Sequence, residues 1–186
     1  MVTEKIKAAA HQVAAILSGK AGILNTLERE HAEASALMQK VLSARDPAAK
    51  AEEHFPTIRR KLLLHARAEQ DVLYAACEKR PQTSSMIPTS LGEHAELERM
   101  IGELDHLPVD SQAWLDEFRR LEQTVRHHVE QEENLLFERC QDAFENHELR
   151  ELDREYDDAK TLVEGKLSEP PMTRRSTSTH HSSMMP

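Results

Sequence analysis

The chain has 186 residues, of which 31% are charged and 39% hydrophobic, and its formal net charge is -9. This charge disfavours nucleic acid as a partner, because phosphate binding needs a basic surface. No apolar run is long enough to span a bilayer, and the N-terminus lacks the apolar block of a signal peptide, so we expect no membrane partner and a cytoplasmic location. Only 5 residues are Gly, and good helix formers are abundant, which indicates an all-α protein.

The predicted helices follow one another between breaks marked by proline. A flanking helix is expected within residues 1–22. Four amphipathic helices come next, at about 23–43, 56–79, 90–107 and 110–144. We predict that they form an up-down-up-down four-helix bundle over 23–146. A C-terminal flanking helix is expected at 147–169, and residues 170–186, rich in Ser, Thr and Pro, are predicted to be a disordered tail.

Histidine and glutamate interrupt the apolar stripe of the long helices. In chain order these residues are His31, then His65 with Glu69, then His94 with Glu98, and finally His128 with Glu132. The fourth helix has two adjacent histidines, and only His128 continues the apolar stripe, because His127 lies about 100° away around the helix. We therefore expect His128 to point inward and His127 to point outward or sideways.

The pattern occurs twice, at an offset of 63 residues. "EHAE" is found at 30–33 and again at 93–96, and "HARAEQDVLYAAC" at 65–77 aligns without a gap with "HVEQEENLLFERC" at 128–140. The repeat predicts two pseudo-equivalent helical hairpins. A single HxxxE pair is usually a surface pair, but four histidines and two glutamates buried at matching depth need strong partners. Imidazole and carboxylate together suit iron, manganese or zinc.

The segments "EREH", "LLLHARAEQDVLY", "GEHAELERMI" and "HHVEQEENLLF" resemble hemerythrin-type domains, the HHE cation-binding family, over about residues 23–144. The resemblance implies a non-haem di-iron centre inside the bundle, with an oxo or hydroxo group between the two irons. By position it implies three groups of ligands: His31 and His65 on one iron, His94 and His128 on the other, and Glu69 and Glu132 as bridges.

One position departs from the pattern of the oxygen-carrying members, which have a second histidine one turn after the third-helix histidine. Here that residue is Glu98, and its counterpart in the first half is Ser35. We predict that Glu98 binds the His94 iron directly or through one water. The other iron then keeps an open position beneath Ser35 for O₂ or peroxide. The alternative is that Glu98 turns aside to a hydrogen bond outside the ligand set.

The leading prediction is a protein that binds or senses O₂ or a related small oxidant at this di-iron centre. A glutamate near the metal pair favours the ferric state, which weakens the case for a reversible oxygen carrier. A peroxide-consuming enzyme of catalase or peroxidase type is an alternative, and so is an interaction module that metal merely stabilises. Whether the protein is an enzyme stays open, because a fold and a metal site do not fix an activity.

Several residues near the predicted ligands are expected to play no part in metal binding. Glu30 and Glu93 are predicted to face solvent. Cys77 and Cys140 are predicted to be reduced and to fill the core. Tyr74 is predicted to belong to an apolar lid over the core, with a hydrogen bond toward the site as the alternative.

Overall fold

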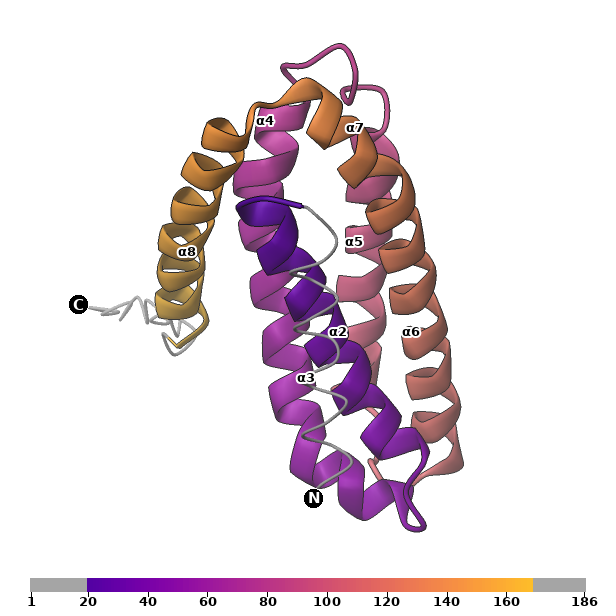
Figure 1. Cartoon of the computed structure of the whole chain (residues 1–186). Coiled ribbons are helices and arrows are strands. Elements are labelled where there is room, and N and C mark those ends of the chain that lie inside the picture. Colours follow the sequence, from indigo (N-terminus) through magenta and orange to yellow (C-terminus); the bar gives the residue numbers. More distant parts are fainter. Residues whose placement is uncertain (1–19, 169–186) are drawn as a thin grey trace, which may run out of the picture.

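The computed structural model describes residues 20–168, and every regular element in that range is helical. The long helices run side by side in alternating directions (Figure 1). They are α2 (Ile23–Leu42), α3 (Pro47–Glu69), α5 (Ile87–Leu104) and α6 (Gln112–Gln131). The prediction of an all-α, up-down-up-down bundle is thus confirmed. The helix predicted in 1–22, except its last three residues, and the tail predicted at 170–186 lie outside the described residues.

The second and fourth long helices each contain a π-helical segment. α3 continues through η1 (Gln70–Tyr74) into α4 (Ala75–Cys77), and α6 continues through η2 (Glu132–Leu136) into α7 (Phe137–Ala143). At the 63-residue offset of the repeat, the second segment begins one residue earlier than the first. A π-helical turn is wider than an α-helical turn, so it rotates the residues that follow it around the helix axis. These segments therefore change which side chains face the interior just beyond the two predicted glutamate ligands.

Two predicted helix starts are wrong. The second long helix begins at Pro47, with Asp46 as its N-cap accepting a hydrogen bond from the Ala49 amide at 3.2 Å, and Pro56 lies inside it. The Asp-Pro pair is the stronger start signal, because it combines a cap with a residue that suits the first turn. The third long helix begins at Ile87, and the capping box predicted at Ser90 does not start it.

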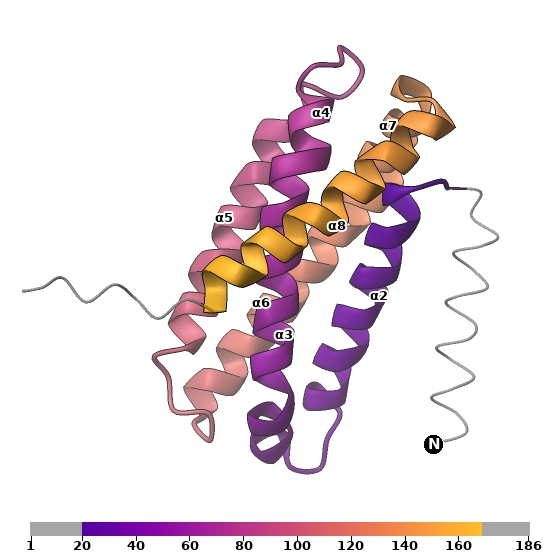
Figure 2. The same cartoon turned by 90° about the vertical axis from the view of Figure 1, so that its left-hand side faces the viewer.

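A further helix, α8 (Asn146–Ser168), lies outside the bundle and passes diagonally across the face that α2 and α3 form (Figure 2). Its buried side chains Leu149, Tyr156 and Val163 recur every seventh residue, which places them on one face. The start of α8 packs tightly against the chain before α2. Gly22 has a φ of +56°, and a Cβ there would lie 2.1 Å from the Leu149 carbonyl oxygen, so this close approach requires glycine.

The core consists of two apolar clusters with a polar layer between them. One is built around Trp114 and Phe118, whose rings stack at 4.9 Å, and the other around Leu27, Leu73 and Phe137. Each fully buried large side chain stabilises the fold by about 2 kcal/mol. The polar layer contains the predicted metal ligands, and the apolar clusters on both sides keep it away from water.

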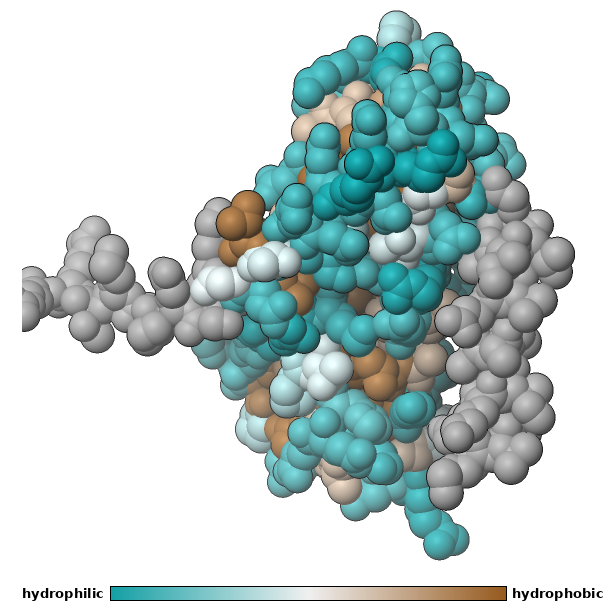
Figure 3. Space-filling model, turned by 60° about the vertical axis from the view of Figure 1, so that its left-hand side comes forward, coloured by the Kyte–Doolittle hydropathy of each residue, from teal (hydrophilic) through white to brown (hydrophobic). Residues whose placement is uncertain are grey.

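The face of the molecule shown in Figure 3 is mostly hydrophilic, and hydrophobic residues form only small, separate patches on it. Among the described residues the exposed large hydrophobic side chains are Leu91, Leu135 and Leu162. Within residues 20–168, no helix is both long enough and apolar enough to cross a membrane.

Candidate metal centre

Six of the seven predicted site residues converge in the polar layer, and none of the six is more than 9% exposed. Their potential ligand atoms fall into two groups, and the atoms of each group lie within 4.8 Å of one another. The groups are His31, His65 and Glu132, and Glu69, His94 and His128. The four histidines come from the long helices, and Glu69 and Glu132 lie where α3 and α6 pass into their π-helical segments.

The four imidazoles form two pairs whose Nε2 atoms face each other. The distance between the two Nε2 atoms is 3.1 Å for His31 and His65, and it is also 3.1 Å for His94 and His128. The pairs are those that the 63-residue repeat predicts. Each pair therefore presents two ring nitrogens to one point in the core.

Each buried carboxylate reaches one histidine of each pair. The Oε2 atom of Glu132 lies 3.4 Å from the Nε2 of His31 and 3.6 Å from the Nε2 of His128. Glu69 makes the same arrangement with the remaining histidine of each pair, at 3.4 and 3.5 Å. A carboxylate placed between two imidazole pairs is suited to bridge two cations.

The carboxylate oxygens fit a cation. In the described part of the chain, both side-chain oxygens of Glu69 and Oε2 of Glu132 have no hydrogen-bond partner. Burial and the neighbouring charge of Glu132 raise the pKa of Glu69 well above its usual value. Burial also opposes the charged form of Glu132, but the close contact with the His31 ring and the charge on nearby histidines outweigh burial and lower the pKa of Glu132. Cations at this point would allow both carboxylates to be charged, and imidazole with carboxylate is a donor set for iron, manganese or zinc.

Two acidic residues, Glu30 and Glu93, form a second layer around the candidate ligands. Each contacts the Nδ1 nitrogen of a histidine, on the side of the ring that faces away from the centre. The Nδ1 of His65 lies 3.2 Å from Glu30 Oε2, and the Nδ1 of His128 lies 2.9 Å from Glu93 Oε2. The expectation that both glutamates face solvent is wrong, because their side chains are only 12% and 20% exposed. Each precedes a histidine of the polar layer in sequence, but its side chain turns toward the histidine of the neighbouring helix. Such partners fix the ring with its proton on Nδ1 and leave Nε2 free to bind metal.

The other two histidines have unequal partners. The Nδ1 of His31 lies 2.8 Å from Glu133 Oε1, whereas the Nδ1 of His94 lies 3.1 Å from the side-chain amide of Gln70. Gln70 and Glu133 occupy equivalent positions of the repeat. Burial alone would lower the pKa of His31, but the carboxylates of Glu132 and Glu133 beside the ring raise it to about 9. Burial and a neighbouring histidine instead lower the pKa of His94 to about 3.

Tyr74 belongs to the apolar cluster and also reaches the site. Its hydroxyl donates a hydrogen bond of 2.7 Å to Glu132 Oε1 and lies 3.3 Å from the Nε2 of His94. The π-helical turn after Glu69 brings a residue five positions later back toward the same face, which an α-helix does not do. The equivalent residue in the other half is Phe137, whose ring stacks on His31 at 6.1 Å.

The structure does not bring Glu98 to the ligand group. Its side chain is 35% exposed, and its Oε1 lies 3.3 Å from the Nε of Arg67, so it follows the alternative of turning aside. Ser35 is exposed and does not lie over the other half of the site. The buried residues one turn after His31 and His94 are instead Ala34 and Leu97. On both helices the buried face continues at the third residue after the histidine, and the fourth residue points outward. The predicted contrast between Glu98 and Ser35 is therefore replaced by a contrast in size between Ala34 and Leu97.

Comparison with known proteins agrees with this geometry. The Hemerythrin HHE cation binding domain family matches residues 22–140. The chain belongs to this family. A hemerythrin HHE cation binding domain-containing protein from Mycobacterium kansasii has the same fold, with a TM-score of 0.68 and 19% identity over 78% of this chain and 88% of that chain.

A curated relative in Nostoc sp. bears the name DNA nickase. It is 25% identical over 150 residues, which are 78% of this chain and 41% of the relative. The chain therefore spans about two-fifths of the length of that protein.

A cavity of about 230 Å³ leads to the metal centre of this HHE domain. The four histidines of the polar layer line it, together with Ala34 and Leu97. At its outer end the lining includes the charged side chains of Arg60, Lys160 and Glu164. The lining thus passes from exposed charged groups to buried imidazoles, which gives a small molecule a route into the polar layer.

The remaining histidines and the cysteines of the HHE domain lie outside the ligand groups. His54, His106, His127 and His147 are elsewhere, and His11, His180 and His181 lie outside the described residues. Cys77 and Cys140 are fully buried free thiols, and their Sγ atoms are 3.4 Å apart in the apolar cluster. They are core residues of the second cluster, at equivalent positions of the two halves.

Proposed function

We propose that this HHE domain holds two non-haem iron ions and that it binds or senses O₂ or a related small oxidant. One observation carries the proposal: two buried carboxylates each reach one histidine of each imidazole pair, and three of their four oxygens have no hydrogen-bond partner among the described residues. Two imidazole pairs joined by two carboxylates suit two ions better than one. Nitrogen and carboxylate oxygen donors together suit iron.

The residues around the ligands prepare the site for a small ligand. Bound iron supplies the electrons that an oxidant accepts. The cavity beside Ala34 admits a molecule of the size of O₂, and the apolar clusters on both sides of the polar layer limit access by water. The hydroxyl of Tyr74 holds a proton 2.7 Å from Glu132 Oε1, at the edge of the ligand group.

Peroxide consumption is the second candidate, and Tyr74 is the observation that favours it. Cleavage of an O–O bond requires a proton donor close to the metal, and the Tyr74 hydroxyl is fully buried within hydrogen-bond distance of one carboxylate and one imidazole. A carrier or sensor does not cleave the O–O bond and therefore does not need this proton donor.

A single experiment separates these candidates. The full chain is purified without oxygen, and its metal content is measured by mass spectrometry beside its absorption spectrum. We expect two iron ions per chain and a spectral change when O₂ or hydrogen peroxide is added. A lasting change supports binding or sensing, and sustained loss of added peroxide supports the enzyme. A protein that takes up no iron, or only one ion, contradicts the di-iron proposal.

We further infer that this chain acts in the cytoplasm and without nucleic acid. The free thiols of Cys77 and Cys140 suit a reducing compartment, and a net charge of -9 opposes phosphate binding. The name of the Nostoc relative makes DNA binding worth testing directly. A gel-shift and plasmid-nicking assay at low salt is expected to show neither binding nor strand cleavage by this chain, and cleavage that metal removal abolishes would contradict the inference.

A further inference from the structure

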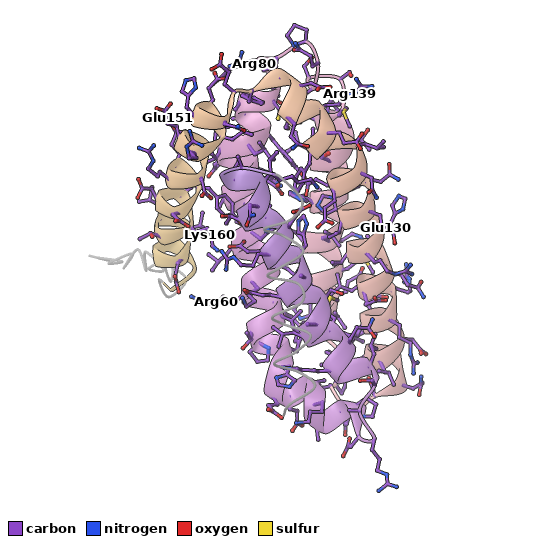
Figure 4. All side chains as sticks on the ribbon, in the orientation of Figure 1. Arg60, Arg80, Glu130, Arg139, Glu151 and Lys160 are labelled. Atoms are coloured by element: carbon purple, nitrogen blue, oxygen red, sulfur yellow. The ribbon has the colours of Figure 1, made fainter. Side chains whose placement is uncertain are left out.

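α8 lies beyond the residues that the family matches, yet it touches the second layer of the metal centre. Tyr156 is fully buried, and its hydroxyl donates a hydrogen bond of 2.7 Å to Glu30 Oε2. Lys160, one turn later, makes an ion pair with the other oxygen of Glu30. Figure 4 shows Lys160 between α8 and the bundle, above Arg60 of α3. Both oxygens of this glutamate are thus held from a helix outside the four-helix bundle.

Glu30 in turn contacts His65, one of the proposed metal ligands. Its Oε2 lies 3.2 Å from the Nδ1 of His65, and the Tyr156 hydroxyl lies 3.3 Å from the same nitrogen. Because Tyr156 and Lys160 hold both of its oxygens, the Glu30 carboxylate is fixed as the acceptor for the Nδ1 proton of His65, and Nε2 is turned toward the centre.

The equivalent glutamate in the other half has no such cover. Glu93 holds His128 at 2.9 Å, but it borders a surface hollow of about 250 Å³ together with Ser85 and Gln131. Among the described residues, Glu93 also lies 4.0 Å from the Nε2 of His127, whose side chain is 64% exposed. Within residues 20–168, no hydroxyl or ammonium group donates a hydrogen bond to Glu93. The two halves of the repeat therefore have matching inner residues, but among the described residues only in the first half does a further helix hold the glutamate behind the histidine.

We propose that Tyr156 and Lys160 are positioning residues of the metal centre, acting through Glu30 on the orientation of His65. The ion bound by His65 is then held more firmly than the ion bound by His128, and the firmness depends on a helix that lies outside the matched domain. This inference rests on the proposed binding of two metal ions.

The test follows iron release from the full chain, loaded with ferrous iron without oxygen and mixed with excess ferrous chelator. Tyr156→Phe keeps the buried ring and removes only the hydroxyl, and Lys160→Met removes only the charge. We expect wild-type protein to release iron in two phases, and each variant to speed up the slow phase by about tenfold, since changes in such outer partners alter metal affinity by 10–100-fold. Glu93→Gln is expected to speed up the fast phase instead.

Arg154→Met is the matched control, because it removes an exposed cation from the same helix without touching Glu30. It is expected to leave both phases at wild-type rates. Equal acceleration of both phases in Tyr156→Phe would indicate general loosening of the fold and overturn the proposal. Release at wild-type rates from both α8 variants would also overturn it while leaving the di-iron proposal intact. Wild-type protein without bound iron would overturn both.

Discussion

The two halves of the candidate metal centre have the same kinds of potential ligands and different surroundings. In the first half α8 covers the supporting glutamate, and in the second half the equivalent glutamate borders a surface hollow. Two further contrasts lie in the same outer layer. They are Glu133 against Gln70 beside the α2 and α5 histidines, and Phe137 against Tyr74 at the ends of the π-helical turns. The comparison teaches that an internal repeat can preserve a binding site while its supporting residues specialise each half.

The largest expected effect comes from removing what the two halves share. Because Glu132 reaches one histidine of each pair, Glu132→Ala is expected to lose most of both bound ions, as measured by mass spectrometry of the purified protein. His127→Ala is the control, since this side chain is 64% exposed and lies outside the ligand groups. Full metal occupancy in Glu132→Ala would remove the basis for a shared bridge.

Removal of metal is expected to destabilise both halves together. A metal ion that binds only the folded state raises the free energy of unfolding by about 2.7 kcal/mol when its free concentration is 100 times its Kd. For a domain of this size that corresponds to a fall in Tm of roughly 5–10 °C when a chelator removes the metal. Calorimetry with and without chelator measures the change. An unchanged Tm after verified metal loss would show that the buried carboxylates do not depend on cations.

Substitution at Tyr74 sharpens the comparison with Phe137. Tyr74→Phe removes the donor to Glu132 Oε1 and leaves another buried carboxylate oxygen without a partner, so the free energy of unfolding should fall by about 2 kcal/mol. Denaturant titration of the metal-free protein measures it. The ring itself fits, because the equivalent position already carries phenylalanine. A variant as stable as wild type would mean that this hydrogen bond contributes nothing.

An exchange at Gln70 should make the halves more alike. Gln70→Glu gives His94 the acidic partner that His31 already has, and an acidic partner makes an imidazole a stronger donor to metal. We expect about tenfold slower release of the ion at His94 to a chelator. Glu133→Gln is the reciprocal variant, with about tenfold faster release of the ion at His31. Equal release rates in wild type and both variants would show that this contrast has no effect on metal.

The smallest effect is expected at Glu98. Its ion pair with Arg67 is partly exposed, so Glu98→Ala should lower stability by less than about 1 kcal/mol and leave the metal content unchanged. Thermal unfolding and metal analysis of the same sample check both statements. Loss of iron from this variant would return Glu98 to the ligand set and would show that its side chain moves when metal binds.

The sequence by itself determined the bundle and predicted the six residues that converge in the polar layer. The spacing of three and four residues identifies the buried face of a helix, and the repeat selects His31 and His94 among the eleven histidines. The same spacing selected Ser35 where the structure has Ala34 on the buried face. Positions three and four residues after a buried residue both lie near that face, so the spacing alone does not choose between them. The repeat could not correct this error, since both halves carry it.

Only the tertiary structure decided which residues surround the candidate ligands. Whether Glu30 faces solvent or His65 depends on how far α2 is rotated against α3, and that rotation is set by packing across the whole interface. The π-helical turns then changed the direction of Tyr74 by an amount that no helical period predicts. The cover of α8 over one half depends on the close approach at Gly22, a contact between residues more than a hundred positions apart. Helical periodicity shows which residues point inward, but contacts between helices decide which neighbours they meet.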